Sequence, residues 1–135
     1  MAIQLSTAVR NARLDAIEST AGASAILRIR TGAQPANCAA TRSGTVLATV
    51  NLPSDWMLAA TGGSKAMTGT WSDNSADAAG TAGHFEIMDS TATTCHLQGN
   101  VTATGGGGDM TLDNVVFAAG QAFSVTSFAL TDANA

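Results

Sequence analysis

Short stretches in which apolar and polar residues alternate recur along most of this sequence, and they constrain its fold more than any other feature. The clearest are residues 24–31 (SAILRIRT) and 45–52 (TVLATVNL). A period of two is typical of strands that bury one face. Arg28 and Arg30 share one face of the first stretch with Ile26. The residues on its other, apolar face are Ala25, Leu27 and Ile29.

Further candidate strands follow at regular spacing, each bounded by Gly, Pro, Asn, Asp or Ser. They cover residues 65–72, 84–89, 94–104, 109–117 and 121–131. The glycine- and alanine-rich residues 73–83 read as a loop. The sequence therefore predicts a mainly β fold, a β-sandwich or jelly roll of about eight short strands, with a small barrel as a related solution.

The last of these stretches has an ambiguous pattern. Phe123 and Val125 lean to one face, whereas Phe128 and Leu130 fall on the other. A slip of one residue near Thr126 would bring the two pairs to the same face. The sequence leaves both possibilities open.

The N-terminal segment has a different period. Residues 5–19 (LSTAVRNARLDAIES) show helical spacing, and Gly22 is a suitable terminator. One row of this helix is apolar, with Leu14 and Ile17 beside it; the row is Leu5, Val9, Ala12 and Ala16. A short isolated helix is marginal in water, so we expect this one to lie against the domain or a neighbour. The predicted organisation is a helix or arm over residues 1–22 and one β-sandwich domain over residues 23–135.

Composition and charge restrict the function. Charged residues make up 12% of the chain, and the net charge is −4. A surface of Thr, Ala and Gly can meet a protein partner with little desolvation of ions, although it also suits a plain alanine-rich domain. An acidic chain without Tyr is a poor candidate for nucleic-acid binding. No apolar run approaches transmembrane length and no secretory signal is evident, so we expect folding in a cytoplasm with Cys38 and Cys95 reduced. A bond between them remains open.

No constellation of residues points to catalysis, a metal or a cofactor. The glycine run at residues 105–108 lacks the helix and the Lys-Ser/Thr pair of a phosphate-binding loop, and reads as a mobile hairpin tip. Cys95 and His96 would face opposite sides of a strand, which leaves too few ligands beside His84 for zinc. Glu86 and Asp89 make a poor glycosidase pair. We therefore expect a non-enzymatic protein.

Two sets of residues suit an interaction surface. Arg28 and Arg30, together with Arg10 and Arg13, form either a patch for an acidic partner or a solvated face with local ion pairs. Trp56 and Trp71 are expected in the core, with an interface role as the alternative.

Read as a whole, the chain resembles small virion proteins of tailed bacteriophages and prophages. The segments that carry the resemblance span nearly the full length: AIQLSTAVRNARLDAIEST, SAILRIRTG, TVLATVNLPSDW, ADAAGTAGHFEIMDSTATTCHLQGNVTATGGGGDM and AAGQAFSVTSFALTD. The resemblance implies a virion component, most similar to capsid cement (decoration) proteins. Such proteins bind the outside of the head as dimers or trimers and bridge neighbouring major capsid subunits. It defines no motif of functional residues.

The resulting expectation is a capsid cement protein on the virion surface, assembled in the host cytoplasm, without a cofactor, nucleic acid or membrane as partner. Its partners would be the phage major capsid protein and other copies of itself. The predicted partner contacts are Leu5, Val9, Arg10, Arg13, Ile17, Arg28 and Arg30. A head–tail connector or tail protein is the alternative within the virion. A carbohydrate-binding β module is the alternative of another class, with Trp56 and Trp71 as its aromatic candidates.

Overall fold

A computed structural model describes residues 3–133 and shows the mainly β fold with one N-terminal helix that the sequence predicts. The helix begins at Thr7, after the N-cap Ser6, and ends before the C-cap Gly22. The elements in chain order are α1 (Thr7–Ala21), β1 (Ile26–Thr31), β2 (Val46–Asn51), β3 (Ser64–Ala66), β4 (Ser72–Asp73), β5 (Gly80–Met88), β6 (Cys95–Ala103), β7 (Met110–Leu112), β8 (Val116–Phe117) and β9 (Phe123–Thr131).

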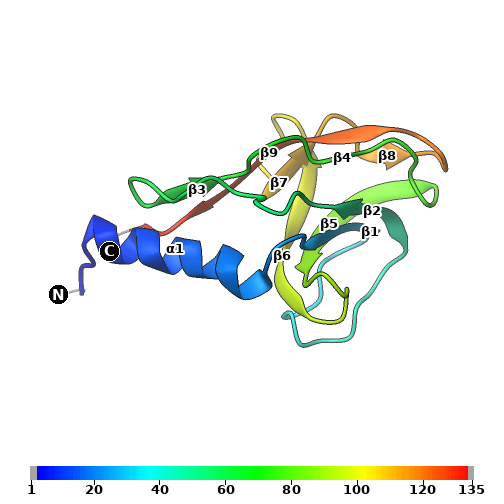
Figure 1. Cartoon of the computed structure of the whole chain (residues 1–135). Helices are drawn as coiled ribbons and strands as arrows, with labels where there is room; N and C mark the ends of the chain where they lie inside the picture. Colours follow the sequence, from blue (N-terminus) through cyan, green and yellow to red (C-terminus); the bar gives the residue numbers. More distant parts are fainter. Residues whose placement is uncertain (1–2, 134–135) are drawn as a thin grey trace.

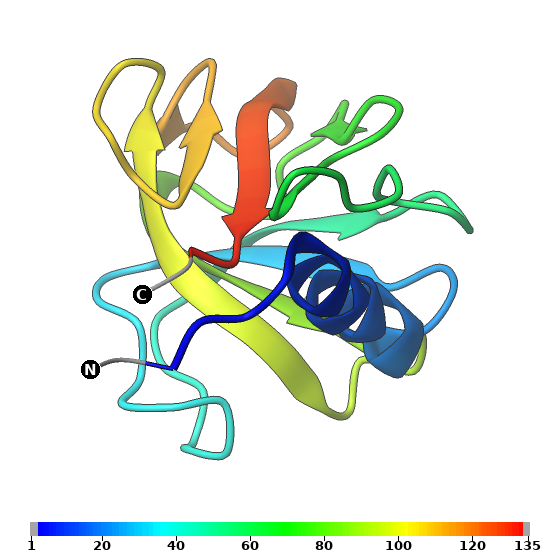
Figure 2. The same ribbon diagram turned by 90° about the vertical axis from the view of Figure 1, so that its left-hand side faces the viewer.

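The strands form one curled sheet in the order β2-β1-β5-β6-β7-β9-β3, with β4 paired to β9 and β8 paired to β5. The curl gives a half-barrel, consistent with the predicted β-sandwich-like fold, and α1 lies beside it, seen nearly end-on in Figure 2. α1, β3 and the end of β9 together project from the main body of strands (Figure 1). We call this projecting part the arm.

The core fills the concave side of the sheet. The apolar face of β1 is buried as predicted, with Leu27 and Ile29 fully enclosed. Trp56 and Trp71 are also fully buried, which confirms their expected place in the core. Their rings lie 6.0 Å apart between centroids, and Trp71 packs on Phe128 at 5.4 Å. These aromatic contacts join the segment after β2 to β9.

β5 is longer than the sequence predicts and is buried on both faces. It begins at Gly80, inside the stretch expected to be a loop, because residues 80–82 pair with β1 and β8. His84 and Glu86 are as fully enclosed as the apolar residues with which they alternate. The reason is that β5 lies between β1 and β6, with the core on one side and the loop of residues 32–45 on the other.

β9 contains the slip that the sequence left open. Leu112 of β7 pairs with Val125, whereas the preceding Thr111 pairs with Ser127, so Thr126 is the extra residue of a bulge. A bulge reverses the alternation, and Phe128 is consequently buried on the same side as Phe123 and Val125.

The glycine run at residues 105–108 is not a hairpin tip, and that prediction is wrong. β6 and β7 are parallel neighbours, so the chain must turn back between them within six residues, where a crossover usually needs a dozen or more. Gly105 and Gly107 supply positive φ angles of 86° and 79°. Gly106 and Gly108 fold onto Thr102, whose Oγ1 accepts a hydrogen bond from Gly108 N at 2.9 Å. The glycines therefore build a compact crossover.

Candidate interaction surface

α1 is attached to the sheet by a polar stripe rather than by its apolar row. The stripe consists of Asn11, Asp15 and Glu18, which lie on one face of the helix. Their side-chain oxygens accept hydrogen bonds from the backbone N–H groups of Gly63, Ala60, Trp56 and Met57, at 2.9–3.1 Å. The helix therefore provides hydrogen-bond acceptors for backbone N–H groups of residues 56–63, which would otherwise be unpaired near the core.

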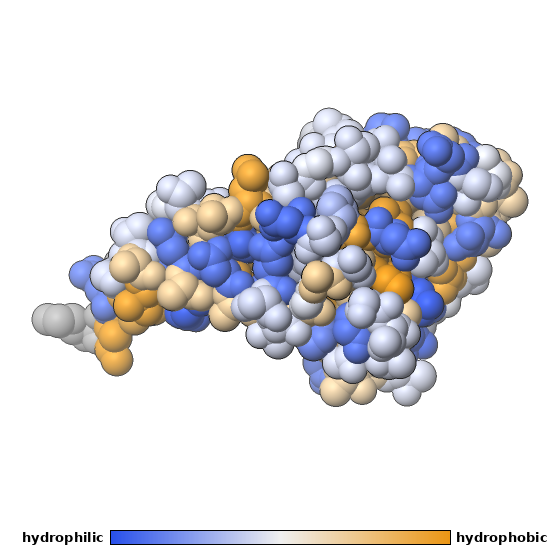
Figure 3. Space-filling view, in the orientation of Figure 1, coloured by the Kyte–Doolittle hydropathy of each residue, from blue (hydrophilic) through white to orange (hydrophobic). Residues whose placement is uncertain are grey.

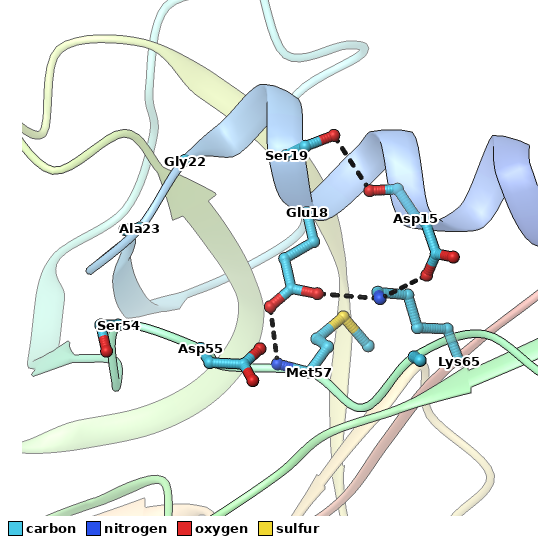
Figure 4. A pocket seen from close by; sticks show the side chains of 10 residues that line it. Asp15, Glu18, Ser19, Gly22, Ala23, Ser54, Asp55, Met57 and Lys65 are labelled. Atoms are coloured by element: carbon cyan, nitrogen blue, oxygen red, sulfur yellow. Dashed lines mark hydrogen bonds and ion pairs between the residues drawn. The ribbon is translucent and has the colours of Figure 1, made fainter.

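Lys65 of β3 closes this attachment (Figure 4). Its Nζ donates to Asp15 Oδ1 at 2.7 Å and to the carbonyl oxygen of Leu58 at 2.8 Å, and it lies 2.8 Å from Glu18 Oε2. The Lys65 side chain is only 2% exposed. An ammonium group has three donors, and all three have an acceptor here. We call Lys65, Asp15 and Glu18 the helix clamp.

The three charges of the helix clamp hold one another in the ionised state. The Lys65 and Ala60 donors lower the pKa of Asp15. Burial raises the pKa of Glu18, but hydrogen bonds from Lys65 and the Met57 backbone outweigh it, so the net shift is downward. Burial likewise lowers the pKa of Lys65, and its bonds to Asp15 and Glu18 outweigh this, so the pKa rises. The clamp is therefore fully charged at neutral pH.

A hollow of about 430 Å³ lies beside the clamp, lined by Asp15, Glu18, Asp55, Lys65 and small residues of α1 and the following turn (Figure 4). The lysine and its carboxylates are all engaged with one another or with backbone groups. These contacts position the helix against the sheet. Among the described residues, no group of three His, Cys, Asp or Glu is placed to hold a metal ion.

The apolar row predicted for α1 lies on the side turned away from the clamp. Val9 is 46% exposed, and Ala12 and Ala16 are exposed as well, while Leu5 is partly buried. Leu14 and Ala21, outside this row, are the residues that α1 buries. We call Leu5, Val9, Ala12 and Ala16 the outward row. In the isolated chain, the helix thus presents small and apolar side chains to its surroundings.

A groove runs along the flank of α1, where it faces β6 and the end of β9. Two adjoining hollows of about 250 and 310 Å³ share Arg13 and Ile17 as walls. Arg13 forms a surface ion pair with Asp132 at 3.2 Å, and Arg10 Nη1 donates to the Asp132 carbonyl oxygen at 3.0 Å. Of the predicted contacts, Val9, Arg10, Arg13 and Ile17 therefore lie on the arm, with Arg10 partly buried, and Leu5 lies just before α1.

Two further exposed apolar side chains, Ile3 and Leu58, lie next to the arm, whereas Val116 of β8 is exposed outside it. Ile3 precedes α1. Leu58 follows Trp56 and Met57, whose backbone N–H groups donate hydrogen bonds to Glu18. Figure 3 shows hydrophobic residues on the surface of the arm, next to hydrophilic ones. The exposed apolar area of the arm thus extends beyond the outward row.

Arg28 and Arg30, the remaining predicted contacts, lie elsewhere, on β1, and Arg30 Nη1 donates to the Gly44 carbonyl oxygen in the loop of residues 32–45 at 3.2 Å. Arg30 Nε donates to Glu86 Oε1 at 2.9 Å, and its side chain is 11% exposed. Arg28 is partly buried, with Nη1 3.9 Å from Met88 Sδ. The structure thus brings together the helix residues of the predicted surface but separates them from these two arginines.

Arg42 organises this second region, and the sequence reasoning did not single it out. Its Nη1 donates to Glu86 Oε2 at 3.2 Å and to Gln98 Oε1 at 3.0 Å, and its Nη2 donates to three carbonyl oxygens of its own loop. Glu86, fully enclosed, is paired with Arg30 and Arg42. In the sequence, Arg42 stands out only as a single arginine among small residues. Sequence periodicity cannot identify the partner of a side chain that lies in a loop.

Comparison with known proteins identifies no relative of this chain. The chain matches no protein-family model, no curated protein and no solved structure. None of the helices in residues 3–133 has the length and apolar character needed to cross a membrane.

Proposed function

We propose that this chain is a non-enzymatic structural protein of a bacteriophage virion, a capsid cement protein that binds the outside of the head and bridges major capsid subunits. The observation that carries the proposal is the outward row. A helix held to its own domain by charged and polar groups, with its apolar side exposed, is built to meet another protein.

The clamp suits such a role because it fixes the helix before any partner arrives. A preorganised surface loses less conformational entropy on binding than a flexible one. Alanines in the outward row allow a partner backbone to approach closely, and Arg13 at the flank offers a cation to an acidic partner surface. A modest interface of this kind stabilises a shell through its many copies, by mass action.

Self-association as a dimer or trimer belongs to the same proposal, since cement proteins bridge several capsid subunits at once. The alternative within the virion is a head–tail connector or tail protein, for which the same outward row would serve as the contact. The carbohydrate-binding alternative is less favoured, because Trp56 and Trp71 are both fully buried and offer no ring to a sugar.

A sedimentation experiment tests the proposal. The purified chain is mixed separately with heads assembled from the major capsid protein of the same phage genome and with isolated tails. We expect saturable co-sedimentation with heads, at a fixed number of copies per capsid subunit, and heads that resist heat or chelators better when loaded. Binding to tails alone would favour the alternative, and binding to neither would overturn a virion role.

A further inference from the structure

The fold brings the two cysteines of the chain together. Cys38 lies in the loop of residues 32–45, and Cys95 begins β6, 57 positions later in the sequence. Their Sγ atoms lie 2.9 Å apart, with the Cys95 thiol donating to Cys38. Both side chains are partly buried, and both are free thiols.

The surrounding contacts hold this pair in place. Arg42 Nη2 donates to the carbonyl oxygens of Asn37 and Cys38, at 2.8 and 3.1 Å, and so fixes the loop backbone at the cysteine. Gln98 of β6 donates through Nε2 to the carbonyl oxygen of Pro35 at 2.7 Å, which ties the same loop to the same strand. The Arg42 Nη1 group also lies 3.5 Å from Cys95 Sγ. The two sulfurs thus face each other across an interface that is fastened on both sides.

We propose that Cys38 and Cys95 are a covalent modification site, a latent disulfide that fastens the loop of residues 32–45 to β6 when the protein meets an oxidising environment. The S–S bond of a disulfide is about 2.05 Å long. The sulfurs must therefore approach by roughly 1 Å, which small rotations of two side chains supply. The inference does not depend on the proposed virion function.

The oxidant is a small-molecule disulfide of the glutathione class. The thiolate of one cysteine attacks it, forms a mixed disulfide and releases one small thiol. The second cysteine then attacks the protein sulfur of the mixed disulfide, forms the Cys38–Cys95 bond and releases the second small thiol. Two protein thiols lose two electrons and two protons, and the oxidant gains them as two thiols.

The environment of the pair favours Cys38 as the first attacking group. Burial, together with the neighbouring Cys38, raises the pKa of Cys95 to about 12. Cys95 is therefore almost wholly protonated at neutral pH, and a protonated thiol is a poor nucleophile. In the mixed disulfide Cys38 carries no charge and no longer raises the pKa of Cys95, so Cys95 acts as the resolving sulfur, at a distance that already brings it into contact with its target.

Thiol counting on the purified full-length chain tests the proposal. The wild type, Cys38→Ser and Cys95→Ser are equilibrated with mixtures of reduced and oxidised glutathione, and free thiols are trapped with a maleimide before intact mass is measured. We expect the wild type to yield a monomer that has lost two hydrogen atoms and takes up no maleimide. Its Tm should rise by roughly 5–15 °C on oxidation, whereas neither serine variant should gain stability.

Three results would overturn the inference. Wild-type thiols that stay free in fully oxidised glutathione would show that the pair does not close. Glutathione adducts or disulfide-linked dimers as the main products would show that each cysteine reacts separately. An internal disulfide without a rise in Tm would show that the bond does not fasten the loop to β6. Under reducing conditions, near-equal Tm values of the three proteins verify that the serine variants are folded.

Discussion

Lys65 Nζ and Glu18 Oε2 lie 2.8 Å apart, although 47 positions separate them in the sequence, and this ion pair joins the helix to the sheet. Glu18 also accepts hydrogen bonds from two backbone N–H groups through its other oxygen. The contact therefore fixes both the position of α1 and the path of the segment that precedes β3. Its consequence is that the apolar side of α1 remains exposed.

Removing the cation of the clamp should release the helix. In Lys65→Met, two carboxylates remain near one another without their counter-charge, and we expect a loss of about 2–3 kcal/mol in the free energy of unfolding. The estimate lies below the range for fully buried pairs because the Asp15 side chain is 47% exposed. Urea unfolding followed by tryptophan fluorescence measures the loss.

Arg13→Met is the matched control for that variant, since it removes the α1 cation of a surface ion pair with Asp132, which follows β9. It should cost less than about 1 kcal/mol. Equal losses of unfolding free energy in the two variants would contradict the claim that Lys65 holds the helix to the sheet.

Stability should depend on pH through the same three groups. Asp15 and Glu18 have pKa values below their ordinary 3.8 and 4.5, so their contribution is present above those values and is lost as the pH falls through the lower, folded-state values. The pKa of Lys65 is above its ordinary 10.5, so its contribution is present below that value and is lost as the pH rises further.

Measurement of Tm against pH for the wild type and the double variant Asp15→Asn, Glu18→Gln tests this dependence. We expect the wild type to be the more stable protein at neutral pH and the difference to shrink on acidification below about pH 4. A difference that stays constant down to pH 2 would mean that the carboxylates do not stabilise the fold through their charge.

The buried ion pairs under the loop give a separate prediction. Glu86→Gln keeps the shape of the side chain but leaves Arg30 and Arg42 without their anion, and should cost about 3 kcal/mol in urea unfolding. The loop should also open, so trypsin should cleave after Arg42 faster than in the wild type. Asp77→Asn, at an exposed carboxylate that accepts one hydrogen bond from Thr49, should change neither quantity appreciably. Unchanged cleavage after Arg42 in the Glu86 variant would contradict the role of this pair in holding the loop.

The sequence predicts the elements of this fold better than their contacts. The alternation in β1 and the helical spacing before Gly22 depend on local periodicity, and both are confirmed. The docking face of α1 was not predictable in this way, because hydrophobic periodicity points to the apolar row and the helix binds through Asn11, Asp15 and Glu18. Their partners are backbone groups 38–52 positions away, which carry no side-chain signature.

The other features that the sequence did not predict also depend on pairing between segments that are distant in the chain. The glycine run reads as a hairpin until β6 and β7 are known to be parallel. His84 and Glu86 alternate with Phe85 and Ile87 in the sequence, and that pattern does not show that the loop of residues 32–45 covers them. The proximity of Cys38 and Cys95 depends on that same loop. In each case the missing information is which segment covers a strand, and a one-dimensional pattern does not contain it.

The most direct test of the central claim compares two charge insertions on exposed valines. Val9 is in the outward row, whereas Val116 is in β8, outside the arm, and is 61% exposed. Neither Val9→Glu nor Val116→Glu should lower the free energy of unfolding by more than about 0.5 kcal/mol. In co-sedimentation with phage heads, we expect Val9→Glu to weaken binding at least about tenfold, the effect of burying an unpaired charge at an interface. Val116→Glu should bind like the wild type, and undiminished head binding by Val9→Glu would contradict the claim that α1 presents the contact surface.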